Sequence, residues 1–73
     1  MTSPGMVAVQ SSNLAAVGYN PSTAELVIAF HSGRVYTYFG VPESVYVGLL
    51  NSPSKGEYHA AHIKNVFAYR RDQ

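Results

Sequence analysis

The sequence contains no cysteine, and this absence excludes a disulfide scaffold, a cysteine-ligated zinc site and thiol catalysis. Charged residues make up only 12% of the chain and hydrophobic residues 47%, a composition unlike that of disordered tails and solvating linkers. No run approaches the roughly 20 apolar residues of a membrane span. The N-terminus lacks a basic segment followed by an apolar one, so no secretory signal is evident and we expect a cytoplasmic protein without membrane partners.

The excess of positive charge is small and unevenly placed. Five basic and four acidic residues leave a formal net charge of +1, which is little for binding a long phosphate backbone. Residues 55–73 hold most of the cations, namely Lys55, Lys64, Arg70 and Arg71, against two carboxylates, Glu57 and Asp72. Any preference for an anion is therefore expected in this C-terminal part.

The length of 73 residues suits a single small domain spanning residues 1–73, with a thin core and a flexible start at 1–5. Four segments have the composition of strands: residues 6–10, 14–19, 25–31 and 34–39. The segment 67–71 either adds an edge strand or packs as a loop. From Pro42 the periodicity becomes helical. The capping-box spacing of Ser54 and Glu57 then predicts a second helix to about residue 65, with three residues on its inner side: Ala60, Ile63 and Phe67.

These elements predict an α+β fold, a small antiparallel β-meander packed against one or two short helices. We expect the hairpin of residues 25–39 to be its centre. The predicted core comprises Leu14, Val17, Leu26, Ile28, Phe30, Val35, Phe39, Val45, Leu49, Leu50 and Ile63.

The hairpin decides which side chains share a face. A two-residue loop of Ser32 and Gly33 would pair Phe30 with Val35 and place a core face on Leu26, Ile28, Phe30, Val35, Thr37 and Phe39. The opposite, amphipathic face would then carry Val27, Ala29, His31, Arg34, Tyr36 and Tyr38. A three-residue loop would shift this pairing, but Arg34, Tyr36 and Tyr38 would still share a face.

Several ordered segments resemble the KTSC domain family over about residues 7–71. They are Ser11-Ser12-Asn13-Leu14, Val17-Gly18-Tyr19-Asn20-Pro21, the hairpin with its central Tyr36-x-Tyr38, Val41-Pro42-x-x-Val45-Tyr46, and Ser54-Lys55-Gly56-x-Tyr58. The family is named for a C-terminal extension of some lysyl-tRNA synthetases and also occurs as small stand-alone proteins of bacteria and phages. The resemblance implies a role in RNA binding, which its synthetase context suggests. Asn20, Pro53 and the pair His59-Ala60 depart from the family pattern, so the ligand of this chain could differ.

Three groups of residues are candidates for ligand contact. Arg34, Tyr36 and Tyr38 form a stacking platform for bases, unless a helix covers them as core residues. Lys55, Tyr58 and His59 at the start of the second helix favour an anion, unless the capping box already satisfies that end. Ser12 lies in a polar turn that either contacts the ligand or satisfies only its own backbone.

The sequence offers little for catalysis or metal binding. Its four carboxylates form no acid–base pair, and no nucleophile motif is present. His59 and His62 share a helical spacing but have no third metal ligand, so we interpret them as solvated or packed histidines and expect no metal site and no cofactor.

We therefore predict a non-catalytic binding module for a nucleotide-type anionic ligand. In one version, the ligand is RNA or another single-stranded nucleic acid. In the other, a homo-oligomer binds and sequesters a small nucleotide, as a phage protein of this family could do. The alternative is a protein–protein interaction or assembly module that uses the tyrosine-rich face, because Tyr and Arg are also enriched at protein interfaces.

Overall fold

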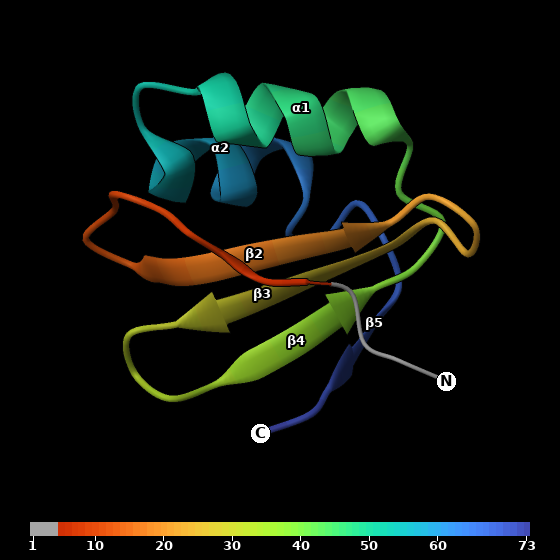
Figure 1. Ribbon diagram of the computed structural model, residues 1–73, viewed down its shortest axis with the longest axis horizontal. Helices are drawn as coiled ribbons and strands as arrows, with labels where there is room; N and C mark the ends of the chain where they lie inside the picture. The colour runs from red at the N-terminus through yellow and green to blue at the C-terminus, as the bar shows by residue number, and fades with distance from the viewer. Residues whose placement is uncertain (1–4) are drawn as a thin grey trace.

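The computed structural model describes residues 5–73. It forms one five-stranded antiparallel sheet in the order β1-β2-β3-β4-β5, with two short helices on one face (Figure 1). The predicted α+β meander is therefore confirmed, whereas the flexibility expected for residues 1–4 lies outside the described residues. The elements are β1 (Val7–Ala8), β2 (Leu14–Asn20), β3 (Glu25–Phe30), β4 (Val35–Tyr38), α1 (Glu43–Asn51), α2 (Lys55–His62) and β5 (Tyr69–Arg71).

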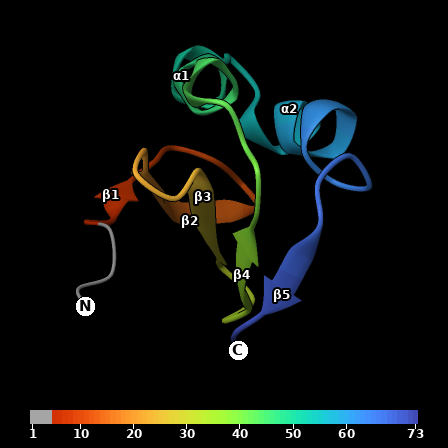
Figure 2. The same cartoon turned by 90° about the vertical axis from the view of Figure 1, so that its right-hand side faces the viewer.

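The molecule has two layers, and its core lies between them. Figure 2 shows α1 and α2 side by side above the sheet, while β5 returns beneath them to lie beside β4. The fully buried side chains include six predicted core residues: Leu14, Val17, Leu26, Ile28, Leu49 and Ile63. Phe30, Val45 and Leu50 are half-buried against this core. Tyr38 and Val41 are also buried. Neither was in the predicted core, but burial of Tyr38 beneath a helix was the alternative to the predicted stacking platform.

The turn of the central hairpin overturns the predicted face assignment. The loop has three residues, because the Phe30 N–H donates to the Arg34 carbonyl at 2.9 Å and the Gly33 N–H to the Phe30 carbonyl at 3.0 Å. Gly33 makes this loop possible with a positive φ of 95°. Ile28 therefore lies opposite Tyr36, and Leu26 opposite Tyr38.

This one-residue shift moves the tyrosines to the face beneath the helices. Tyr36 and Tyr38 share that face with the core residues of β3, since directly paired residues in a sheet point to the same side. Val35, Thr37 and Phe39 consequently lie on the opposite face, so their assignment to the core face was wrong. Thr37 is nevertheless buried there, where its hydroxyl donates to the Asp72 carboxylate at 2.6 Å.

The helices begin close to the predicted places but differ in detail. The capping box at the start of α2 is absent: the Ser54 side chain makes no capping bond, and the Ser54 N–H instead donates to the Ser52 hydroxyl at 3.1 Å. The helix ends at His62 rather than near residue 65, where Asn65 adopts a positive φ of 65°. Ile63 is buried as predicted, but Ala60 is exposed, so its inner placement was wrong.

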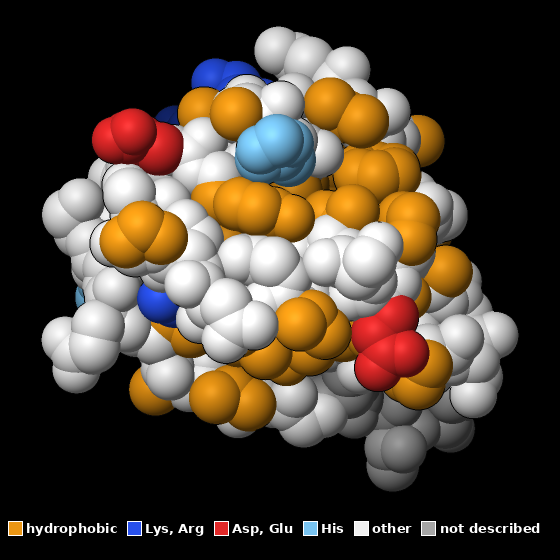
Figure 3. All heavy atoms as spheres, turned by 90° about the horizontal axis from the view of Figure 1, so that it is seen from above, with side chains coloured by type: hydrophobic (Ala, Val, Ile, Leu, Met, Phe, Trp, Pro, Cys, Tyr) orange, Lys and Arg blue, Asp and Glu red, His pale blue; other side chains and the backbone are white. Residues whose placement is uncertain are grey.

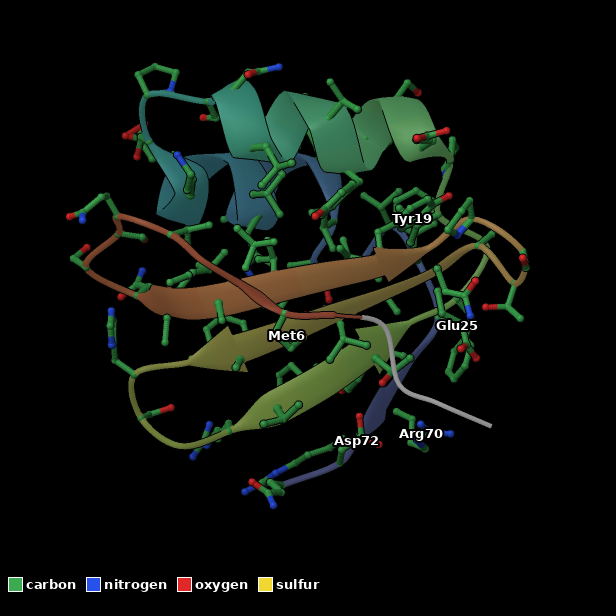
Figure 4. The ribbon with its side chains drawn as sticks, in the orientation of Figure 1. Met6, Tyr19, Glu25, Arg70 and Asp72 are labelled. Atoms are coloured by element: carbon green, nitrogen blue, oxygen red, sulfur yellow. The ribbon has the colours of Figure 1, made fainter. Side chains whose placement is uncertain are left out.

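The C-terminal tail forms the edge strand that the sequence left open. β5 pairs with β4 so that Tyr69 lies opposite Tyr38 and Arg71 opposite Tyr36. Arg70 and Asp72 point toward one another in Figure 4, with 2.6 Å between Nε and the carboxylate. The hydrogen bonds from Thr37 and Arg70 lower the pKa of Asp72 below its usual range. Within residues 5–73, no helix is long and apolar enough to cross a membrane.

Candidate ligand-binding groove

A groove runs along α2, between this helix and two turns of the sheet. Three adjoining hollows form it, with volumes of about 280, 490 and 520 Å³. The first and middle hollows share Phe30, Ser32, His59 and Lys64 in their walls. The middle and last hollows share Ser12, Asn13, Gly56 and Ala60. Because neighbouring hollows have common walls, we treat them as one groove with a ring end (the first hollow) and a polar end (the last).

Aromatic rings line the ring end. The ring centroids of Tyr36 and Tyr69 lie 5.4 Å apart, those of Tyr38 and Tyr69 5.9 Å, and those of Phe30 and Tyr36 5.6 Å. Phe30 also meets the imidazole of His59 edge-on at 5.3 Å. Tyr69 is 59% exposed whereas Tyr38 is 2% exposed, so Tyr69 is the ring that is free to stack on a ligand.

A buried hydrogen bond joins β4 to α2 at the base of the ring end. The Tyr38 hydroxyl lies 2.8 Å from Nε2 of His59. Burial, reinforced by the neighbouring Tyr36 and Tyr69, raises the pKa of Tyr38 to about 12. Burial, reinforced by the positive charge of Lys64, lowers the pKa of His59. Both groups are therefore neutral near pH 7, and a single hydrogen bond between neutral partners joins the strand to the helix.

The ring end is also positively charged. Arg34 and Lys64 line it, and no carboxylate does. Both cationic residues are exposed to solvent, so a ligand can reach their charged groups. Rings beside two cations form a surface that suits a planar, anionic ligand.

The polar end is built where the turn at residues 11–13 approaches the start of α2. The Ser11 hydroxyl accepts hydrogen bonds from the N–H groups of Asn13 and Leu14, both at 3.2 Å, and holds the turn in shape. A Cβ on Gly56 would lie 3.0 Å from Nδ2 of Asn13, so glycine allows this close approach. Lys55 and Glu57 carry the charges at this end.

The structure brings six of the seven predicted site residues to the groove. Arg34, Tyr36, Tyr38 and His59 line the ring end, and Ser12 and Lys55 line the polar end. The stacking platform is only partly available, because Tyr38 is a core residue and Tyr36 is half-buried.

Tyr58 is the exception and lies apart from the groove. Its side chain packs toward α1, where a Cβ on Gly48 would lie 2.9 Å from the tyrosine Cζ atom. Its ring also lies 4.5 Å from that of His62. Tyr58 therefore joins the two helices and is left out of the site.

The predicted site omitted five lining residues of the ring end: Phe30, Ser32, Lys64, Asn65 and Tyr69. The alternation of residues 67–71 was the available signal for Tyr69, since an edge strand beside β4 places it next to Tyr38. Nothing in the local pattern indicated that the irregular turn after α2 would bring Lys64 to the same hollow.

The outer surface of the helices has a different character. Figure 3, seen from the helical side, shows hydrophobic side chains spread over this face. Val47 of α1 and Val66 after α2 are 45% and 59% exposed. No group of three His, Asp or Glu side chains that could hold a metal ion occurs in the described part of the chain.

Comparison with known proteins identifies relatives of two kinds. The chain is 42% identical over 62 residues to a lysine–tRNA ligase of Nostoc sp., covering 85% of this chain and 11% of the ligase. It therefore spans about a tenth of the length of this relative. It is also 41% identical over 61 residues to an uncharacterized protein of Stutzerimonas stutzeri, covering 84% of this chain and 80% of that protein.

A solved structure and a family match agree with these relatives. The crystal structure of a KTSC domain protein from Yersinia pestis superposes with a TM-score of 0.91 at 32% identity, covering 97% of this chain and all of that one. Residues 10–67 match the KTSC domain family. Sequence and structure together show that the chain belongs to the KTSC domain family.

Proposed function

We propose that this protein is a non-catalytic binding module for a nucleotide-type anionic ligand, which it holds at the ring end of the groove. One observation carries the proposal: an open hollow combines an exposed tyrosine ring with two cations and contains no carboxylate. A base stacked on Tyr69 would contribute about 1–3 kcal/mol. Arg34 and Lys64 are placed to attract the attached phosphate.

The acid–base properties of the site support binding rather than catalysis. Its buried tyrosine has a pKa of about 12 and is a poor proton donor at neutral pH. The Nε2 atom of His59, which would act as a base, is already engaged in a hydrogen bond with that tyrosine. The pair is well suited to holding β4 and α2 together.

The proposal predicts a specific loss of binding. Tyr69→Ala is expected to weaken the binding of uridine monophosphate by about 1–3 kcal/mol, because the stacking surface is removed. Arg34→Ala is expected to weaken it through the loss of a charged contact. Isothermal titration calorimetry at two salt concentrations measures both effects.

Arg70→Ala is the matched control for Arg34→Ala. It also removes one arginine charge, but Arg70 bonds to Asp72 and does not line the groove. If the two arginine variants weaken binding equally, the ligand responds to net charge and the site assignment is wrong. If no nucleotide binds and a pull-down recovers a protein partner with little salt dependence, the chain is an interaction module instead.

Native mass spectrometry tests how many chains hold the ligand. The ring end has a volume of about 280 Å³, at the lower limit of ordinary ligand pockets, and is open to solvent. A mass of several chains with a stoichiometric small molecule would support a homo-oligomer that encloses a nucleotide. A monomer without such a mass would favour a single chain with an open groove.

A further inference from the structure

We propose that the groove binds a single-stranded oligonucleotide of about three nucleotides, with one base at the ring end and its backbone running along α2 to the polar end. This inference rests on the proposed function and specifies the class of ligand. It follows from the length, continuity and changing chemistry of the groove.

Continuity is the first argument. The middle hollow shares four wall residues with each end, so a ligand can pass from Tyr69 to Lys55 without leaving the surface. A mononucleotide would fill the ring end alone and leave two larger hollows empty. An extended ligand would use the entire groove.

The length of the groove fits a few nucleotides. It follows α2, whose eight residues span about 12 Å at the usual rise of a helix. A stacked strand rises about 3.4 Å per nucleotide, so this distance corresponds to about three nucleotides. Lys55 is the first residue of α2 and Lys64 lies two residues after its end, so a lysine at each end can neutralise a phosphate.

The side chains that line the groove change from one end to the other, and they match the different parts of an oligonucleotide: base, phosphate and sugar. Arg34 and the three tyrosines line only the ring end, whereas Phe30 and Lys64 continue into the middle hollow. Beside Lys64, the wall of the middle hollow carries hydrogen-bonding side chains, namely Ser12, Asn13, Ser32 and His31. These groups can contact sugars and base edges. Stacking on Tyr69 needs a base released from a duplex, which favours a single strand.

Binding of hexauridylate and of uridine monophosphate to the same protein tests the inference. Hexauridylate is expected to bind at least tenfold more tightly. Its affinity should fall with salt at a logarithmic slope of about −2, as for three phosphates neutralised on a single strand by Arg34, Lys64 and Lys55. A stable RNA hairpin whose uridines are all base-paired should bind at least tenfold more weakly.

Lys55→Met tests the contribution of the polar end separately from that of the ring end. This change removes the charge and keeps an unbranched side chain, so the fold should survive the loss of the 3.1 Å bond from Lys55 Nζ to the Ser52 carbonyl. It is expected to weaken hexauridylate binding about 5-fold to 10-fold and to leave uridine monophosphate binding unchanged. Glu57→Gln at the same end should strengthen hexauridylate binding and again leave the mononucleotide unaffected.

The outcomes distinguish this inference from the proposed function. Equal affinities for both ligands, with no effect of Lys55→Met or Glu57→Gln, would overturn the oligonucleotide inference and leave a mononucleotide site at the ring end. The absence of binding by either ligand would overturn both. Preference for the duplex would contradict the stacking of a released base.

Discussion

Replacing Ile63 with alanine is expected to lower the free energy of unfolding by about 2–5 kcal/mol, the range for large-to-small changes in cores. Ile63 is fully buried and lies just after α2, where it packs between the helical layer and the sheet. A domain of this size has a total stability of only about 5 kcal/mol or somewhat more. The variant should therefore be largely unfolded at modest temperature or in dilute urea.

Val66→Ala is the matched control, because Val66 lies three residues further along the chain and is 59% exposed. Urea denaturation followed by circular dichroism should show a change within about 0.5 kcal/mol for this variant. Equal destabilisation by the two substitutions would mean that Ile63 is not part of the core.

Replacing Tyr38 with phenylalanine is expected to lower the free energy of unfolding by about 1–3 kcal/mol. The change keeps the ring but leaves Nε2 of the buried His59 without its hydrogen-bond partner. Double substitution of Tyr38 and His59 by phenylalanine should cost less than the sum of the single changes, because the two groups are coupled. Tyr36→Phe is the control, since Tyr36 lies on the same strand but is only half-buried.

The same pair predicts how stability depends on pH. His59 has a lowered pKa in the folded protein, so below about pH 6.5 the unfolded chain takes up a proton that the native protein excludes, and stability falls. Tyr38 has a raised pKa, so between about pH 10 and 12 the unfolded chain loses a proton that the native protein keeps, and stability falls again.

Thermal unfolding across this pH range checks both directions. Relative to the wild type, Tyr38→Phe should lose part of the alkaline decrease, and His59→Phe part of the acidic decrease. An unchanged alkaline profile in Tyr38→Phe would show that its hydroxyl titrates normally and is not held at the base of the groove.

Local patterns in the sequence were sufficient for much of the fold. β-branched and aromatic runs predicted the strands, and apolar spacing at Val45 and Leu49 predicted α1 with Leu49 in the core. The register of the central hairpin could not be predicted from such local patterns. Two and three residues are both compatible with His31, Ser32 and Gly33, and only the hydrogen bonds of Phe30 choose between them.

The candidate site shows the same division. Residue type indicated that Arg34, Tyr36 and Lys55 could contact a nucleotide, and the structure brings all three to the groove. Tyr58 looked equivalent in sequence but packs against α1, because its direction depends on the packing of the two helices at Gly48.

By itself, the sequence determined the fold class, the family resemblance, most of the core and the residue types available for binding. These properties follow from composition and short-range periodicity, which act within one element. The tertiary structure alone decided that Tyr38 is buried, that Tyr69 is the exposed ring and that Lys64 lies beside it. Those facts depend on the strand register and on the pairing of β5 with β4. The paired residues lie about 30 positions apart in the chain, so no local pattern of the sequence specifies their contact.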